Sequence, residues 1–235
     1  MNAILHPPAL KSAPDPAVAP TPSAPEPVSA RLELIGLSCV RGTRRLFSNV
    51  DSVVQAGQLL RLQGANGAGK TSLLRTVCGL SAPDRGEVRW RGRSIAADRD
   101  AFHRDLIYLG HAAALKDDLS ALENMQAACM LGGQRPSPSQ MMSALAVAGL
   151  RQREHLSARS LSQGQRRRVS LARLVLKPSP PLWVLDEPFN ALDVAATDWL
   201  LFVVTAQLRA GGIVVLTSHQ PVAIDASLSQ VTLTL

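Results

Sequence analysis

The sequence predicts an α/β fold, and two features carry that prediction. The segment Gly64–Thr71 fits the pattern G-x-x-x-x-G-K-[ST], between an apolar run at residues 59–62 and a helical pattern at residues 72–77. Strand, glycine-rich loop and helix in this order are the setting that the pattern requires. Further along, apolar strands at residues 182–185 and 213–216 alternate with helical segments, so a β/α pattern resumes there.

The first part of the chain is predicted to be rich in strands. Residues 1–30 consist mainly of Pro, Ala and Ser and hold half of the 16 prolines, so we expect a disordered tail. Residues 31–235 are expected to fold, because alternating apolar segments separated by glycine-containing turns begin there. The expected strands lie at residues 32–40, 46–54, 59–62 and 87–90.

A helical insertion is predicted over about residues 112–160. Apolar residues recur at helical spacing in residues 119–131 and 141–150, and Ser139 is a candidate N-cap for the second helix. Beyond the insertion, we expect helices at residues 161–176 and 194–209, and strands at residues 182–185, 213–216 and 231–235.

Composition limits the compartment and the kinds of site. The 235 residues are 46% hydrophobic, and no run of about 18 apolar residues occurs that would span a membrane. The start lacks the basic end and the long apolar stretch of a signal peptide, so we expect a cytoplasmic chain. Cys39, Cys78 and Cys129 stand singly, so we expect buried small residues rather than a metal site or a redox pair.

The formal net charge of +7 permits several anionic partners. Basic residues cluster at residues 41–45, 85–93 and 166–168, but none of these clusters is interleaved with aromatic residues. Single-stranded nucleic acid usually stacks on aromatic side chains, so we expect no nucleic-acid partner. A solvated surface or a face turned towards a membrane accounts for the basic clusters equally well.

The glycine-rich loop is suited to hold a nucleotide. Its glycines let successive backbone N–H groups point at phosphate oxygens, and the following helix adds the positive end of its dipole. We expect Lys70 to neutralise the β- and γ-phosphates and Thr71 to place a hydroxyl on Mg²⁺. The predicted nucleotide-binding residues are Gly64, Ala65, Asn66, Gly67, Ala68, Gly69, Lys70, Thr71 and Ser72.

Two carboxylates follow the apolar strand at residues 182–185. A buried strand that ends in Asp186 places this carboxylate at the edge of the sheet beside the phosphates, where it can hold Mg²⁺ through water. Glu187 comes one residue later and is the candidate to polarise the attacking water. An exposed turn is the alternative, and the glycine-rich loop upstream favours the catalytic interpretation.

The segment Leu161, Ser162, Gln163, Gly164 and Gln165 resembles the LSGGQ signature of ABC-type ATPases, with Gln163 where glycine is usual. The resemblance covers about residues 31–235. It implies an ABC ATPase domain with a mixed β-sheet core, an antiparallel β subdomain and a helical signature subdomain. It also implies ATP and Mg²⁺ as cofactors. In that family the signature binds the γ-phosphate of ATP held by another subunit, so the resemblance implies a head-to-tail dimer with a second copy.

Other segments resemble further motifs of the same family. Residues 190–193 resemble the D-loop, with Asp193 at its end, and His219 resembles the switch histidine that contacts the γ-phosphate. Two positions depart from the family pattern. Arg41 stands where an aromatic residue would stack on adenine, although a guanidinium can also stack on a purine. His111 stands at the Q-loop position, where glutamine normally contacts Mg²⁺ and water.

Details of several segments resemble one subfamily, the ATP-binding subunits of the bacterial cytochrome c maturation system. These segments are residues 110–111, 115–124, 161–168 and 183–189, and the short C-terminus fits as well. The resemblance implies haem export or release of the haem-loaded chaperone CcmE, driven by ATP hydrolysis. It further implies a peripheral position on the cytoplasmic face of the bacterial inner membrane, with the membrane subunits CcmB, CcmC and CcmD as partners.

Two alternatives remain open at the level of the sequence. One is the ATPase subunit of another ABC exporter. The other is a soluble ABC protein that acts on nucleic acid. The chain has no long coiled-coil insertion and no tandem second ATPase domain, and this argues against that alternative.

Overall fold

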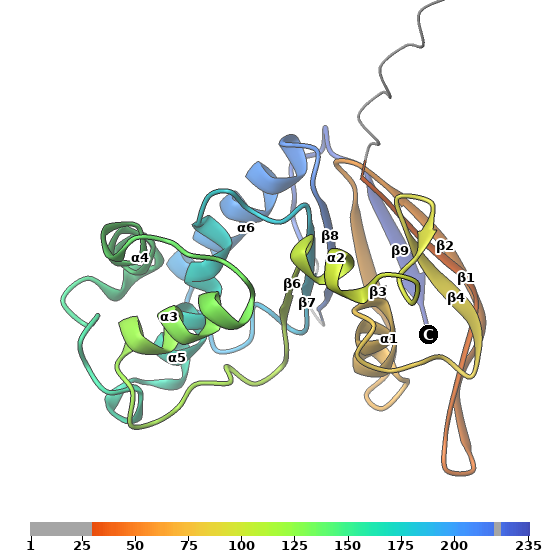
Figure 1. Cartoon of the computed structure of the whole chain (residues 1–235), viewed down its shortest axis with the longest axis horizontal. Helices are drawn as coiled ribbons and strands as arrows, with labels where there is room; N and C mark the ends of the chain where they lie inside the picture. The colour runs from red at the N-terminus through yellow and green to blue at the C-terminus, as the bar shows by residue number, and fades with distance from the viewer. Residues whose placement is uncertain (1–29, 219–221) are drawn as a thin grey trace, which may run out of the picture.

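The computed structural model describes residues 30–218 and 222–235 (Figure 1). The predicted tail, except for Ala30, and His219 lie outside the described residues. The strands are β1 (Arg31–Arg41), β2 (Arg44–Gln55), β3 (Leu59–Gln63), β4 (Arg85–Trp90), β5 (Arg93–Ser94), β6 (Leu106–Leu109), β7 (Leu182–Leu185), β8 (Ile213–Thr217) and β9 (Gln230–Thr234). The α-helices are α1 (Lys70–Val77), α2 (Arg99–Arg104), α3 (Ala121–Leu131), α4 (Pro138–Leu145), α5 (Gln163–Leu171) and α6 (Val194–Arg209).

A parallel sheet forms the centre of the protein, with strand order β6-β7-β8-β3-β9. Every residue of β7 and β8 is buried, because both strands are short apolar runs that are covered on both faces. Strand β8 lies between β7 and β3, so the ends of these three strands meet at one edge of the sheet.

The remaining strands form a separate antiparallel sheet in the order β2-β1-β4-β5. Its hairpin between β1 and β2 turns at Gly42, whose φ of 60° favours glycine. Side chains of β1 alternate between buried and exposed, as expected for a strand with one face on the core. The α/β fold is confirmed, with its parallel and antiparallel strands in different sheets.

Two cores lie on opposite faces of the parallel sheet. On one face, α1 and the antiparallel sheet pack against Leu182 and Val184 of β7. On the other, α6 and the end of α5 pack against Trp183 and Leu185 of the same strand. Because successive residues of a strand point to opposite faces, α1 and α5 lie on opposite sides of the sheet. Figure 1 shows this separation, with α3, α4 and α5 on the side away from the antiparallel sheet.

The helical part packs around a third core, to which α3, α4 and α5 contribute. The prediction that Ser139 caps the second helix was wrong, because Ser137 is the N-cap. Ser137 forms a capping box with Gln140, and Pro138 occupies the first turn of the helix. That helix also ends earlier than expected, at Leu145, and a π-helical turn with φ of 78° at Gly149 follows it.

Further elements differ from the expected pattern. The helix expected at residues 161–176 starts at Gln163, because Ser162 caps it, and continues after Leu171 as a 3-10 helix at Ala172–Val175. The short helix α2 and the strands β5 and β6 were not predicted. No helix formed by the described residues is both long enough and apolar enough to cross a membrane.

Candidate functional site

The loop from β3 to α1 has a backbone that depends on its glycines. Gly64, Gly67 and Gly69 have φ values of 145°, 77° and 104°, all in the region that favours glycine. At Gly64 a Cβ atom would also lie 2.7 Å from the carbonyl oxygen of Leu235. Leu235 is held there because its N–H donates to the carbonyl oxygen of Gln63 at 3.0 Å.

Lys70 begins α1 and folds back over this loop. Its Nζ donates to the carbonyl oxygens of Gly64, at 2.7 Å, and Ala65, at 3.2 Å. A positive charge is therefore fixed beside the loop's backbone N–H groups, at the start of a helix. This combination is the arrangement that attracts a phosphate group.

The carboxylate of Asp186 is held by two hydroxyl groups. It is 2% exposed, and its two oxygens accept from Thr71 Oγ1 at 2.9 Å and Thr217 Oγ1 at 2.8 Å. These contacts follow from the strand order, since Thr217 ends β8 beside both β7 and β3. The hydroxyl of Thr217 also accepts from the backbone N–H of Glu187 at 2.8 Å.

Glu187 has an unusual backbone. Its φ is 48°, a left-handed conformation that is uncommon for a residue other than glycine, and it is 8% exposed. Such conformations cluster at functional sites because the surrounding structure must enforce them.

A cavity of about 360 Å³ joins these segments. The predicted site residues along it are Asn66, Gly67, Gly69, Lys70, Thr71, Ser72, His111, Asp186 and Glu187. Leu46 of β2 completes the lining and is the one member that the sequence analysis did not single out. The structure therefore brings the loop, the two carboxylates and His111 to one place.

The negative charge of Asp186 affects the pKa values of two other side chains, those of Cys78 and Tyr108. Burial, with a smaller contribution from Asp186, raises the pKa of the Cys78 thiol far above its ordinary value. Burial and then Asp186 also raise the pKa of the Tyr108 hydroxyl. Both groups are therefore held in their neutral forms.

The predicted signature lies elsewhere. Ser162 is the N-cap of α5: its Oγ accepts from the N–H of Gln165 at 3.2 Å, and the Gln165 side chain accepts from the Ser162 N–H at 3.0 Å. A Cβ atom on Gly164 would lie 2.5 Å from the carbonyl oxygen of Ala191, so the signature packs closely on the predicted D-loop. No signature residue lines the cavity described above, and α5 is on the opposite face of the sheet from α1.

Asp193, at the end of the predicted D-loop, caps α6 and accepts from Ala196 N–H at 2.8 Å. Its other carboxylate oxygen pairs with Arg168 of α5 at 3.3 Å. This pair is a second link between the signature helix and the D-loop.

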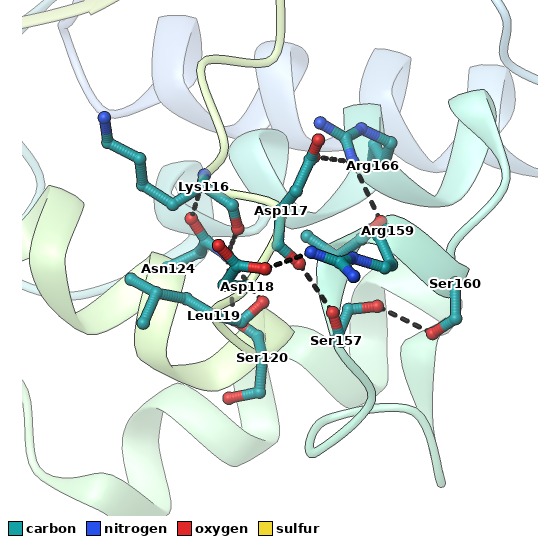
Figure 2. A network of polar contacts seen from close by, with 11 residues as sticks. Lys116, Asp117, Asp118, Leu119, Ser120, Asn124, Ser157, Arg159, Ser160 and Arg166 are labelled. Carbon is teal, nitrogen blue, oxygen red and sulfur yellow. Dashed lines mark hydrogen bonds and ion pairs between the residues drawn. The ribbon is translucent and has the colours of Figure 1, made fainter.

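A polar network fixes the chain just before the signature, as Figure 2 shows. The side chain of Asp117 pairs with Arg166 of α5 at 2.6 Å, and its carbonyl oxygen accepts from Ser157 Oγ at 2.5 Å. Nearby, Asn124 binds the backbone of Lys116 and Leu119 through its amide group. The segment that follows His111 is thus tied to the segment that leads into the signature.

Arg41 does not join the cavity. It is exposed at the end of β1, opposite Arg44 in the hairpin. Arg44 lies closer to the glycine-rich loop, because a Cβ atom on Gly67 would be 3.8 Å from its Nη1. The sequence analysis named Arg41 alone as the residue that would stack on the base, and it did not single out Arg44.

Comparisons with known proteins agree with this geometry. The family model described as ABC transporter matches residues 47–190. A Pyrococcus furiosus chain of known structure, described as an ABC transporter ATP-binding protein, is 25% identical with a TM-score of 0.72, over 86% of this chain and 97% of that one. Fold and site therefore define an ATP-binding protein of the ABC transporter family, to which the chain belongs.

More similar relatives narrow this assignment. The cytochrome c biogenesis ATP-binding export protein CcmA of Dechloromonas aromatica is 53% identical over 195 residues, which is 83% of this chain and 95% of the relative. The CcmA protein of Aromatoleum aromaticum is 52% identical over 184 residues, or 78% of this chain and 86% of the relative. The chain belongs to the CcmA family.

Proposed function

We propose that this chain is the ATP-hydrolysing subunit of a membrane ABC complex for cytochrome c biogenesis, which couples hydrolysis to haem export or to release of the haem-loaded chaperone. The observation that carries the proposal is the cavity in which Lys70, Asp186 and Glu187 meet, in a chain of the CcmA family. A binding protein without catalytic activity would not need a strained carboxylate residue beside the phosphate loop.

The glycine-rich loop binds the phosphates of ATP in this proposal. Backbone N–H groups of the loop and the first turn of α1 surround the phosphate chain, and Lys70 exchanges its carbonyl partners for the β- and γ-phosphates. Arg41 is proposed to stack on the base, and His219, which lies outside the described residues, to contact the γ-phosphate.

The residues present fit a magnesium ion. The hydroxyl oxygen of Thr71 and a carboxylate oxygen of Asp186 are 2.9 Å apart, and both are the hard oxygen ligands that Mg²⁺ prefers. We therefore propose that Thr71 holds the ion directly and that Asp186 holds it through water. When bound, the ion neutralises charge that develops on the phosphates.

Glu187 is proposed as the general base. Its position next to Asp186 and on the cavity lining lets its carboxylate orient a water molecule and accept a proton from it. His111, on the same lining, is proposed to hold that water through its imidazole. Both residues belong to one copy of the protein.

The signature is proposed to act on the nucleotide of a second copy. Since α5 and α1 lie on opposite faces of the parallel sheet, Ser162 and Gly164 do not reach the cavity of their own chain. A head-to-tail pair of copies would bring each signature onto the other copy's bound ATP. We further propose a peripheral position on the cytoplasmic face of the inner membrane, with CcmB, CcmC and CcmD as membrane partners and CcmE downstream.

A cellular experiment tests the proposal. Lys70→Ala removes the phosphate-binding charge, so a strain with only this variant should lose nucleotide binding and leave c-type cytochromes immature, as read by covalent haem staining. Lys116→Ala is the matched control, because Lys116 is exposed and makes its hydrogen bonds through its backbone. Normal cytochrome levels in the Lys70→Ala strain would contradict the assignment to cytochrome c biogenesis.

A further inference from the structure

One buried arginine joins the signature helix to the catalytic segments. Arg167 lies on α5 and is 4% exposed. Its Nη1 donates to the carbonyl oxygens of Gly110 at 2.7 Å and His111 at 3.4 Å. Its Nη2 donates to those of Asp186 at 2.8 Å and Glu187 at 3.0 Å.

The guanidinium of Arg167 suits these contacts in shape. It is a rigid planar group with five N–H donors and no acceptor, so it can bind two diverging sets of carbonyl oxygens at once. Its Nε donates to a fifth carbonyl, that of Pro188, at 3.4 Å. All five acceptors are main-chain carbonyl oxygens. Two of them lie at or next to the Q-loop position, and three lie in the segment that follows β7.

Keeping this cation buried is costly. Burial lowers the pKa of the Arg167 guanidinium, and the nearby carboxylates of Asp186 and Glu187 counteract that effect. A hydrophobic side chain of similar volume would fill this position without the cost of desolvating a charge. A role that requires the guanidinium itself accounts for its presence better.

We propose that Arg167 is a positioning residue that couples the signature helix to the main chain of His111 and Glu187. This inference rests on the proposed function, in which the signature contacts ATP on a second copy. Movement of α5 on contact with that ATP is transmitted through the bound guanidinium of Arg167 to the general base and the Q-loop position of its own copy. The two sites of a dimer are thereby linked.

Other contacts hold the residues that are proposed to bind the nucleotide, so the role of Arg167 can be separated from ATP binding. The side chain of Asp186 is held by Thr71 and Thr217, and Lys70 is held by the loop carbonyls. A change at Arg167 should therefore alter the catalytic rate rather than the affinity for ATP.

Arg167→Lys is the informative variant. Lysine keeps the charge, but its three donors radiate from one atom, so it cannot reach Gly110 and Asp186 together. We expect kcat for ATP to fall by roughly tenfold to a hundredfold, as for small misplacements of catalytic groups, with KM changed less than about twofold. The control is Arg209→Lys, at an exposed ion pair with Asp225, which should leave both constants unchanged.

A second measurement separates positioning from plain stability. Arg167→Lys should be non-additive with His111→Ala in a double-mutant cycle of kcat, because both changes act on the same main-chain segment. If the lysine variant does not fold, Arg167→Gln replaces it: this side chain buries no charge and retains two N–H donors. The expected loss of kcat is the same.

The outcomes distinguish this inference from the proposed function. An unchanged kcat for the Arg167 variants, with an active wild type and an inactive Glu187→Gln variant, would overturn the coupling role and leave the proposed function intact. A lowered melting temperature with an unchanged kcat per folded protein would also overturn it. Normal cytochrome levels in the Lys70→Ala strain would instead contradict the proposed function itself, and rapid hydrolysis by Glu187→Gln would remove only the role of Glu187 as the general base.

Discussion

Thr217 supplies the sharpest test of how Asp186 and Glu187, the proposed catalytic carboxylates, are held. It is fully buried, donates to Asp186 Oδ1 at 2.8 Å and accepts from the Glu187 N–H at 2.8 Å. Thr217→Val removes the hydroxyl and keeps the volume, so no cavity forms. Asp186 loses one of its two hydroxyl donors, and the Glu187 N–H loses this acceptor.

The size of the effect follows from these two bonds. A hydrogen bond to a charged group contributes about 1.5–3 kcal/mol, and a buried donor that loses its acceptor costs about 1–3 kcal/mol. We therefore expect the free energy of unfolding to fall by about 2.5–6 kcal/mol. For a domain of this size each kcal/mol shifts the melting temperature by about 2–4 °C, so Tm should fall by at least about 5 °C.

The assay combines thermal unfolding with ATP turnover. Thr217→Ser is the matched control, since it keeps the hydroxyl and loses one buried methyl group, at a cost of about 1 kcal/mol. We expect kcat of Thr217→Val to fall by about tenfold or more, which corresponds to about 1.4 kcal/mol in the activation barrier. If the valine and serine variants have the same Tm and the same kcat, Thr217 does not hold the carboxylates and the geometric argument is wrong.

Three further predictions concern the general base, the signature and one helix cap. Glu187→Gln should retain ATP in a filter-binding assay but stall hydrolysis, because an amide cannot accept the proton; a rate near that of the wild type would remove Glu187 from this role. Gly164→Ala should lower ATP turnover by about tenfold or more, because its Cβ would lie 2.5 Å from the carbonyl oxygen of Ala191 and displace the D-loop; unchanged turnover would show that this packing is unimportant. Hydrogen bonds from the N–H and hydroxyl of Ser120 hold the pKa of the Glu123 carboxyl below its usual range. The Glu123 carboxylate therefore stabilises the fold at pH values above the usual glutamate pKa. This stabilisation is lost as the pH falls through the pKa of Glu123 in the folded protein. The Tm difference between wild type and Glu123→Ala should shrink as the pH falls from about 7 to about 4.

Strand and loop order could be predicted because the signals were local. The apolar runs of β7 and β8 and the glycine pattern before Lys70 each specify a short segment without reference to the rest of the chain. The sequence also predicted that Asp186 would meet this loop, since carboxyl ends of neighbouring strands share one edge. These features do not depend on knowing the register.

Contacts set by strand order and helix packing could not be predicted. Thr217 bridges the two carboxylate residues only because β8 lies between β7 and β3. Arg44 lies near Gly67 because the β1–β2 hairpin approaches the glycine-rich loop, a tertiary contact that no local pattern specifies. Arg167 was one of three consecutive arginines, and which of them is buried depends on how α5 packs.

Taken together, Thr217 and Arg167 explain how Glu187 keeps its left-handed backbone. The N–H of Glu187 is bound by Thr217 from β8, and its carbonyl oxygen is bound by Arg167 from α5. A φ of 48° is strained for a residue with a side chain, so both ends of the residue must be held for it to persist. The contact from Thr217 comes from the sheet that carries the glycine-rich loop, and the contact from Arg167 comes from the helix that begins in the signature-like segment. The orientation of the proposed general base therefore depends on both parts of the protein, as the proposed completion of the site by a second copy would require.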